Sequence, residues 1–333
     1  MEGEFTVGSL GRNSPFTACR SRVVRPRRES VPRLRLALRI MRVRDFFAAD
    51  RVLRDAEFHR TLHPGADEAG ALCYAASEAT LLKVSRNPHI SVVLTSAHLS
   101  GHVAAAKGVV LCDDPQQAYY DLHNRLVDED RTPLHTDTAI DPSAEIASTV
   151  IIGKRVVIGA GVTIAHGAVL ADYTIIGAGT TVAEYAVIGA RGMQNTKVKG
   201  HFYPVRWAGG VRIGQRCEIL TGAVVQRPYH AEYTEIGDEA RISVRVNVGH
   251  RSIVGTRTMI GGSSQIGGNA RIGSDVWIGQ GSTLSDGIRI GDRAEVKMGS
   301  VVVRDVPAGE AVSGAFALPH EINIEAFTKA RRG

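Results

Sequence analysis

The side chain of His250 is the strongest candidate for chemistry in this chain of 333 residues. It stands in the segment VNVGHRSIVG, directly after Gly249. An imidazole exchanges its proton near neutral pH, so it can take a proton from an amine that attacks a carbonyl carbon. A solvated surface histidine is the competing interpretation, and for a lone histidine it is the more common one. The structural element that holds His250 therefore has to be identified first.

An aliphatic residue occupies every sixth position around His250, from residue 236 to residue 302. A helix repeats every 3.6 residues and a strand every 2, so neither explains this period. A small or β-branched residue usually stands two positions before the aliphatic residue, and a glycine often follows it. This hexapeptide repeat predicts a parallel β-helix in which three hexads close one coil. The aliphatic side chains should point inward, and the glycines should open the corners with φ > 0. The series consists of Ile236, Ile242, Val248, Val254, Ile260, Ile266, Ile272, Ile278, Leu284, Ile290, Val296 and Val302.

The same period begins earlier in the chain, at Ile140, and is interrupted twice. It holds to Ile188, fails between Gly189 and Gly210, and slips again over residues 226–235. Its 24 aliphatic positions correspond to about eight coils, which places the β-helix between residues 138 and 304. Long excursions from a repeat that is stable without them usually serve function. Residues 305–333 are expected to cap the last coil with a short helix.

A small α/β domain is expected between residues 45 and 130, where the six-residue period is absent. Apolar runs rich in β-branched residues predict strands at 71–75, 91–96 and 108–112. Helices are predicted at 51–60, 79–84 and 115–127, the last opened by Pro115 with Asp113 or Asp114 as its cap. Alternating strands and helices are typical of an α/β fold.

Residues 1–44 form a strongly basic leader, with eleven arginines against three glutamates. The leader's charge of +8 exceeds the net +6 of the whole chain, so the remainder carries −2. Such an arm can bind nucleic acid or an anionic membrane surface. We expect a disordered leader instead, or a chain whose true first residue is Met41, with no nucleic-acid partner and at most peripheral membrane contact. No apolar run reaches the length of a signal peptide or a membrane span. Four cysteines without a C-x-x-C pair indicate a reducing cytoplasm.

Between about residues 45 and 325, the chain resembles the UDP-3-O-(3-hydroxyacyl)glucosamine N-acyltransferases of lipid A biosynthesis, within the hexapeptide acyltransferase superfamily. The resemblance rests on the order of the two domains and on the segments IDPSAEI, IGARG, YPVRWAGGVRIG, NVGH and VPAGEAVSGAFALPH. It implies a left-handed β-helix, a homotrimer with sites between neighbouring chains, and an N-terminal domain that holds uridine. It further implies transfer of a (3-hydroxy)acyl group from acyl carrier protein to the amine of a sugar nucleotide, with no bound cofactor.

The resemblance also implies roles for individual residues. The family's catalytic histidine corresponds to His250, and its oxyanion-stabilising glycine corresponds to Gly268, eighteen residues and one coil further on. Because His250 follows the Gly249 corner, its ring should project outward, where a neighbouring chain would partly bury it and suit its pKa to deprotonating an amine. A backbone N–H aimed at the developing charge is what acyl transfer needs. The family's substrate contacts correspond to Tyr74, Ser77, Thr80, Gln226, Ser243 and Gly287.

The chain departs from the family at each of these substrate positions. The family has a stacking phenylalanine and an asparagine where this chain has Tyr74 and Ser77, and a second aromatic residue at Thr80. Tyr74 can still stack on a uracil ring, whereas Thr80 cannot. In the coils, an aspartate and a histidine of the family are replaced by Gln226 and Gly287. A weaker or altered nucleotide preference is therefore expected.

Three other functions are compatible with a hexapeptide β-helix. A γ-class carbonic anhydrase binds zinc through histidines, with a second histidine five residues after the first. Gly255 and Ala171 stand five residues after His250 and His166, so no metal site is expected. A coenzyme-A-dependent acetyl- or acyltransferase acting on another amino sugar is a second alternative, and a scaffold that has lost catalysis is a third.

The two excursions contribute further candidate residues. His201 lies in the first and His230 in the second, and either can line a site. The first excursion is also basic, and its cations can bind phosphates of a nucleotide or of phosphopantetheine, although a solvated loop is the simpler interpretation. These cations are Arg191, Lys197, Lys199 and Arg206.

Overall fold

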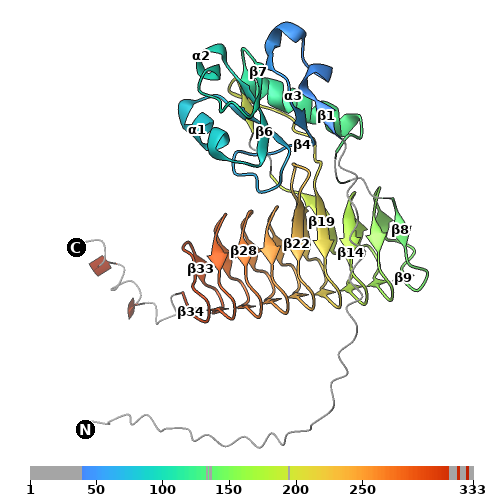
Figure 1. The fold of residues 1–333 in the computed structure, drawn as a ribbon. Coiled ribbons are helices and arrows are strands. Elements are labelled where there is room, and N and C mark those ends of the chain that lie inside the picture. The colour runs from blue at the N-terminus through green and yellow to red at the C-terminus, as the bar shows by residue number, and fades with distance from the viewer. Residues whose placement is uncertain are drawn as a thin grey trace, which may run out of the picture. The chain divides into compact units, whose positions relative to one another are not determined.

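The computed structural model describes residues 40–132, 134, 137–193, 196–314, 321–322 and 328–329. These residues belong to a single compact unit, Leu34–Gly333. They form an α/β part followed by a series of stacked coils (Figure 1). Residues 1–39 of the predicted leader, and most of the predicted C-terminal helix, lie outside the described residues.

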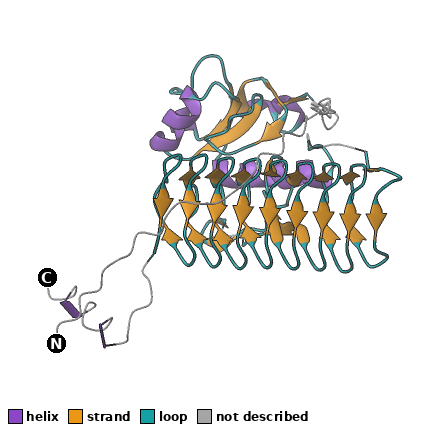
Figure 2. Ribbon diagram, turned by 90° about the horizontal axis from the view of Figure 1, so that it is seen from below, coloured by secondary structure: helices purple, strands orange, loops and turns teal. Residues whose placement is uncertain are grey.

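The coils form a left-handed parallel β-helix with three sheets, one on each face of a prism (Figure 2). The first sheet contains β10 (Ile151–Ile152), β13 (Val169–Leu170), β16 (Val187–Arg191), β21 (Val224–Arg227), β24 (Asn247–Val248), β27 (Gln265–Ile266), β30 (Thr283–Leu284) and β33 (Val301–Val302). The second contains β8 (Ala139–Ile140), β11 (Val157–Ile158), β14 (Thr174–Ile176), β19 (Gly210–Ile213), β22 (Tyr233–Ile236), β25 (Ile253–Val254), β28 (Arg271–Ile272) and β31 (Arg289–Ile290). The third contains β9 (Glu145–Ile146), β12 (Thr163–Ile164), β15 (Thr181–Val182), β20 (Glu218–Ile219), β23 (Arg241–Ile242), β26 (Met259–Ile260), β29 (Trp277–Ile278), β32 (Glu295–Val296) and β34 (Ala311–Val312).

The core of the β-helix consists of the aliphatic residues of the six-residue series from Ile158 onward, whereas Ile140 in the first coil is exposed. Ile266 and Ile278 are 1% and 0% exposed, which confirms the predicted inward direction. A fully buried side chain of this size contributes roughly 1.5–3 kcal/mol. The small residues two positions earlier are buried as well, and their hydroxyls bond to backbone, as when Thr258 Oγ1 donates to the carbonyl of Gly273 at 2.7 Å. The aliphatic residues thus fill the interior, while the hydroxyl groups of the small residues bond to backbone carbonyls at the corners.

The predicted role of the corner glycines is wrong. Apart from Gly189 at φ 91°, the glycines that follow the aliphatic residues are not in the left-handed region. That region instead holds residues three positions after the aliphatic one, such as Arg251 at φ 59° and Asn269 at φ 58°. A Cβ on Gly249 would lie 2.5 Å from the backbone nitrogen of Gly268 in the next coil. Glycine is therefore needed at this corner because successive coils approach too closely for a side chain.

The α/β part is built on a five-stranded sheet with the order β2-β7-β6-β5-β4. Its strands are β2 (Val52–Arg54), β4 (Arg60–Thr61), β5 (Ala71–Ala75), β6 (Ile90–Thr95) and β7 (Gly108–Leu111), of which only β2 runs antiparallel to its neighbour. The helices are α1 (Glu78–Arg86), α2 (Ala97–Ser100) and α3 (Pro115–Asp128). The strands predicted at 71–75, 91–96 and 108–112 correspond to β5, β6 and β7.

Two boundaries differ from the sequence prediction. The helix predicted at 51–60 is absent, because Val52 and Arg54 pair with β7 and the chain continues into β3 (Glu57–Phe58) and β4. Only short 3-10 turns, η1 (Val43–Asp45) and η2 (Ala49–Arg51), precede it. Strand β1 (Met41–Arg42) pairs with β3, so residues 41–44, which the sequence assigned to the leader, belong to the α/β part. Strand pairing outweighs the local helical pattern here.

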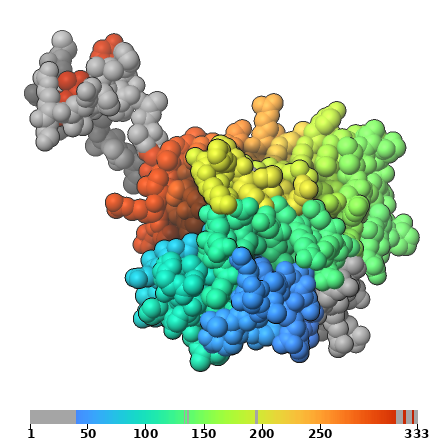
Figure 3. Space-filling view, turned by 90° about the horizontal axis from the view of Figure 1, so that it is seen from above, coloured from blue at the N-terminus to red at the C-terminus, as the bar shows by residue number. Residues whose placement is uncertain are grey.

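Both excursions of the β-helix contact helix α3. The first contains the hairpin of β17 (Lys197–Val198) and β18 (His201–Phe202), and beyond it Asn124 donates to the carbonyl of Pro204 at 2.8 Å. The second excursion brings His230 to the hydroxyl of Tyr119, with 2.7 Å between Nε2 and the oxygen. Figure 3 shows the yellow excursions lying against the green segment that contains α3. The excursions thus connect the β-helix to the α/β part.

Candidate functional site

His250 lies at the corner after β24 and lines a hollow of about 280 Å³. The ring is half-buried within a single chain. The walls come from the loop after β4, from the second excursion and from two coils of the β-helix. The other residues that line the hollow are His63, Pro228, Tyr229, His230, Glu232, Arg251 and Asn269. A half-buried imidazole in a polar hollow does not fit the competing interpretation of a solvated surface histidine.

The turn that carries His250 is held by a buried threonine from the neighbouring coil. Arg251, in the left-handed region, donates its backbone N–H to Oγ1 of Thr234 at 2.7 Å. Thr234 is fully buried, and its hydroxyl in turn donates to the carbonyl of Gln226 at 2.6 Å. The carbonyl of His250 accepts from the N–H of Asn269 at 2.8 Å. The backbone around the histidine is therefore attached to the coil on each side.

The environment of His250 favours its neutral form. Burial lowers the pKa of the imidazole below its ordinary value, and the Asp286 carboxylate opposes this shift only in part. At pH 7 the ring is consequently unprotonated and can accept a proton. This is the protonation state that a general base requires.

Gly268 lies directly against the His250 ring. A Cβ at Gly268 would be 2.7 Å from Nε2 of His250 and 2.7 Å from Oδ1 of Asp286. Its carbonyl accepts from the N–H of Gly287 at 2.8 Å, but its own N–H donates to no acceptor among the described residues. A free backbone donor thus stands beside a neutral imidazole, which is the pairing that can stabilise an oxyanion while a proton is removed.

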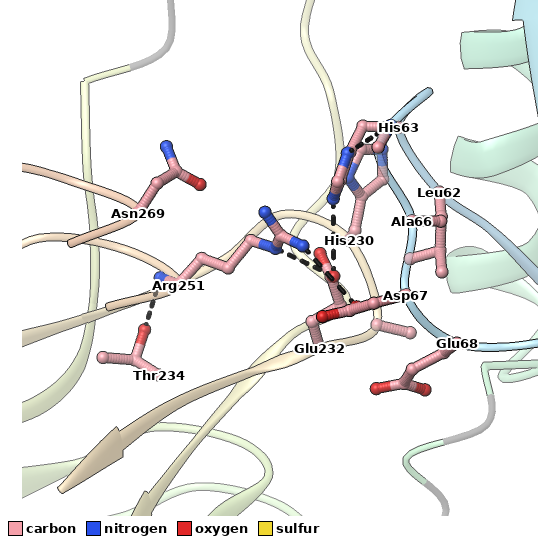
Figure 4. A network of polar contacts seen from close by, with 12 residues as sticks. Leu62, His63, Ala66, Asp67, Glu68, His230, Glu232, Thr234, Arg251 and Asn269 are labelled. Carbon is pink, nitrogen blue, oxygen red and sulfur yellow. Dashed lines mark hydrogen bonds and ion pairs between the residues drawn. The ribbon is translucent and has the colours of Figure 1, made fainter. Parts of the chain in front are cut away.

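A buried carboxylate forms the opposite wall of the hollow. Glu232 accepts a hydrogen bond from Nε of Arg251 at 2.9 Å, and Nε2 of His63 lies 3.6 Å from the same oxygen (Figure 4). Although burial alone would raise the pKa of Glu232, the His63 contact and the charge of Arg251 hold it at about 2. The carboxylate is therefore charged, and its Oε2 has no hydrogen-bond partner within the described part of the chain.

His230 lines the hollow as a neutral side chain that is hydrogen-bonded to the α/β part. It is buried, and burial lowers the pKa of its imidazole well below the ordinary value, so that the ring is neutral. Its Nε2 is hydrogen-bonded to the hydroxyl of Tyr119, which itself donates to the carbonyl of Leu62 at 3.0 Å. The other excursion histidine, His201, is exposed in β18 and does not line the hollow.

One of the substrate positions implied in the coils, Gln226, lies near His250. Gln226, at the end of β21, donates from Nε2 to Oδ1 of Asn247 at 2.9 Å. A Cβ at Gly192 would lie 2.6 Å from Oε1 of Gln226 and 3.9 Å from Cδ2 of His250, so these groups surround one spot. Gly287 is exposed, one coil beyond Gly268. Ser243 lies at the corner after β23 and does not line the hollow.

The three substrate positions implied in the α/β part do not line the hollow either. Tyr74 is half-buried, with its ring 5.1 Å from that of Tyr119, and burial raises the pKa of its hydroxyl to about 12. Ser77 caps α1 by accepting from the N–H of Thr80 at 3.3 Å. The hydroxyls of Ser77 and Thr80 are 3.1 Å apart, so both take part in the helix cap.

Sequence reasoning missed His63, Glu232, Arg251 and Asp286. Glu232 stands two residues after His230 in an excursion that the broken period marked, so that signal pointed to the right segment. His63 follows β4 in a loop without a pattern. Among the described residues, no group of three or more His, Cys, Asp or Glu side chains is placed to hold a metal ion. No helix in the described ranges is long and apolar enough to cross a membrane.

Comparisons with known proteins identify the repeat. The family model described as "Bacterial transferase hexapeptide (six repeats)" matches residues 269–304, and "Hexapeptide repeat of succinyl-transferase" matches residues 149–184. The chain thus carries the hexapeptide repeat of bacterial transferases, in agreement with the predicted acyltransferase enzyme. No curated protein matches the chain by sequence.

Several solved structures resemble the chain over part of its length. UDP-N-acetylglucosamine acyltransferase of Francisella novicida is 25% identical, with 60% of this chain and 73% of that one covered and a TM-score of 0.44. UDP-N-acetylglucosamine O-acyltransferase of Moraxella catarrhalis is 26% identical, with 60% and 82% covered and a TM-score of 0.34. The Arabidopsis UDP-N-acetylglucosamine acyltransferase is 20% identical, with 58% and 77% covered and a TM-score of 0.36. These proteins are described as UDP-N-acetylglucosamine acyltransferases, whereas the sequence pointed to the N-acyltransferases of UDP-3-O-acylglucosamine.

Proposed function

We propose that this protein transfers a (3-hydroxy)acyl group from acyl carrier protein to the amine of a UDP-3-O-acylglucosamine-like sugar nucleotide, in lipid A biosynthesis. The observation that carries the proposal is the contact between the neutral, half-buried His250 and Gly268 with its free N–H. His250 removes the proton of the attacking amine, and the Gly268 N–H holds the oxyanion of the tetrahedral intermediate. Collapse of that intermediate breaks the carbon–sulfur bond, and the protonated His250 returns its proton to the sulfur, so that the carrier leaves as a thiol.

The charged Glu232 suits an amine acceptor. An amino sugar is partly protonated in water, and a carboxylate with one free oxygen attracts its ammonium group. That first proton is released to solvent, so His250 stays neutral for the proton that nitrogen loses as it attacks. His63 and Arg251 hold this carboxylate in place. A hydroxyl acceptor would draw no such benefit from a buried charge.

The proposal extends to the nucleotide and to the oligomeric state. Tyr74 is the remaining aromatic residue for a uracil ring, and we propose weaker or altered nucleotide binding because Ser77 and Thr80 form the α1 cap. We further propose a cytoplasmic homotrimer in which a neighbouring chain closes the hollow at His250. Light scattering should then report about three times the chain mass of 35.7 kDa, and a monomer at micromolar concentration would refute the trimer.

Acyl transfer is tested by offering acyl carrier protein thioesters and coenzyme A thioesters with UDP-3-O-acylglucosamine and other amino sugars. His250→Ala should lower kcat by about 10²–10⁴-fold, the usual contribution of a positioned base. His166→Ala is the matched control, because His166 is an exposed corner histidine whose Nδ1 contacts Thr149. If His250→Ala leaves every observed transfer unchanged, the mechanism is wrong.

The choice of substrates separates the alternatives. Transfer only from acetyl coenzyme A to a different amino sugar would retain the mechanism and remove the lipid A assignment. No transfer from any thioester, by a protein that is folded and has intact coils, would favour the scaffold.

A further inference from the structure

A second hollow, of about 360 Å³, lies on the other side of β21 from the Gln226 contact with Asn247. Gln226 and Arg227 are neighbours at the end of this strand, so their side chains point to opposite faces. Gln226 faces the spot beside His250, and Arg227 lines the second hollow with Asp172 and Trp207. One strand end therefore contributes to both hollows.

The guanidinium of Arg227 is buried and has unused donors. Arg227 is 5% exposed, and its Nε and Nη1 have no hydrogen-bond partner in the part of the chain that the structure describes. The nearest carboxylate oxygen, Oδ2 of Asp172, lies 3.9 Å from Nη1, which is beyond hydrogen-bond distance. An arginine keeps its charge at any physiological pH, so these donors need an acceptor.

Two further arginines stand at the same hollow. Arg191 is paired with Arg227 across β16 and β21, which places two like charges side by side. Arg206, exposed in the first excursion, contacts Asp128 at 3.1 Å. Because Asp128 already neutralises Arg206, Asp172 is the one carboxylate among the lining residues for Arg191 and Arg227. Such a cluster repels itself unless an anion neutralises it.

We propose that this hollow binds a phosphate group of a phosphate ester. A phosphate offers several acceptor oxygens, enough for the two free nitrogens of Arg227 and for the rim arginines at once. The half-buried Trp207 forms a flat wall against which the remainder of the ester can pack. Two sources have this chemistry, a nucleotide and a phosphopantetheine arm. The binding site itself does not depend on acyl transfer.

Tryptophan fluorescence gives a direct test. The chain has two tryptophans, so Trp277→Phe leaves Trp207 as the only reporter. In this background, inorganic phosphate, UMP and 4′-phosphopantetheine are titrated at constant ionic strength. Saturable changes in emission are expected, and tighter binding of UMP or of phosphopantetheine identifies the source. Emission that does not respond to any of the three probes would overturn the proposal.

Arg227→Met tests the buried donors while keeping the side-chain length. It should weaken phosphate binding by about 10–100-fold, as expected for the loss of hydrogen bonds from a charged group. Arg216→Met is the control, because Arg216 is an exposed arginine paired with Glu239 at 2.7 Å. Undiminished phosphate binding by Arg227→Met would refute the assignment.

A second variant protects the test against a folding defect. The double substitution Arg191→Met and Arg206→Met removes exposed rim charges and should also weaken phosphate binding, with the unfolding temperature unchanged. If both rim charges can be removed without effect on phosphate affinity, the hollow is not a phosphate site. His250→Ala should leave phosphate binding intact, so failure of this proposal and failure of the acyltransfer mechanism are distinguishable.

Discussion

A methyl group at position 268 would test the contact on which the proposed chemistry depends. In Gly268→Ala the new Cβ would lie 2.7 Å from Nε2 and 2.9 Å from Cε1 of His250. Heavy atoms of this kind rest at about 3.5 Å or more, so the ring must retreat by roughly 0.8 Å. A misplacement of about 1 Å can cost a catalytic step on the order of 100-fold, which is the fall in kcat expected here.

The same substitution should leave the fold intact. Gly268 is not in the left-handed region, and the atoms that its Cβ meets most closely are the ends of the His250 and Asp286 side chains. Side chains can rotate away, so the unfolding temperature should change little. Gly249→Ala provides the contrast, because its Cβ would meet the backbone nitrogen of Gly268 at 2.5 Å and the coil itself would have to deform.

The measurement is kcat for acyl transfer together with thermal unfolding of each variant. Gly262→Ala serves as a matched control, since its Cβ would meet the Val244 carbonyl at 3.2 Å, away from His250. We expect a kcat defect in Gly268→Ala, a stability defect in Gly249→Ala and neither in Gly262→Ala. Full activity of Gly268→Ala would show that the position of the His250 ring does not matter to the reaction.

Because burial lowers the pKa of His250, kcat/KM should rise with pH through an inflection below 6.5. The Asp286 carboxylate raises that pKa, so Asp286→Asn should move the inflection to still lower pH. An inflection at the same pH in Asp286→Asn would show that Asp286 does not act on His250. Glu232 has a folded-state pKa of about 2 against an ordinary 4.5, so its charge stabilises the fold above pH 4.5 and this contribution is lost as pH falls toward 2. Denaturant unfolding should therefore show Glu232→Gln to be about 3 kcal/mol less stable at pH 7, with a gap that narrows in acid; a constant gap would contradict the linkage. A chain shortened to begin at Met41 should unfold at the temperature of the full chain. A chain beginning at Asp45 lacks the buried Met41 and Val43 and should unfold at a lower temperature. Equal unfolding temperatures of the two shortened chains would show that β1 does not stabilise the fold.

The fold of the coils could be predicted from the sequence because a period of six alone decides which side chains are buried. Ile266 and Ile278 are inside for that reason. The role of the corner glycines could not be predicted in the same way. Whether Gly249 serves a positive φ or a close approach depends on the spacing between coils, and that spacing is not a property of any one hexad.

The candidate site was predictable only where it follows the repeat. His250 and Gly268 are eighteen residues apart, so the coil period itself places them in neighbouring coils. Glu232 and His63 meet because an excursion of the β-helix contacts a loop of the α/β part. No local pattern encodes such a meeting, although the broken period around Glu232 did mark the segment that makes it.

Strand β21 relates the two hollows to each other physically. The carbonyl of Gln226 accepts from the hydroxyl of Thr234, and that hydroxyl accepts from the N–H of Arg251, the residue after His250. Arg227 is the next residue along β21. A phosphate bound at Arg227 would therefore contact the end of β21, and that strand end supports the turn that carries His250. If the bound ester belongs to a substrate, its binding energy is available for placing His250, and truncated substrates that lack the phosphate should lose kcat as well as affinity.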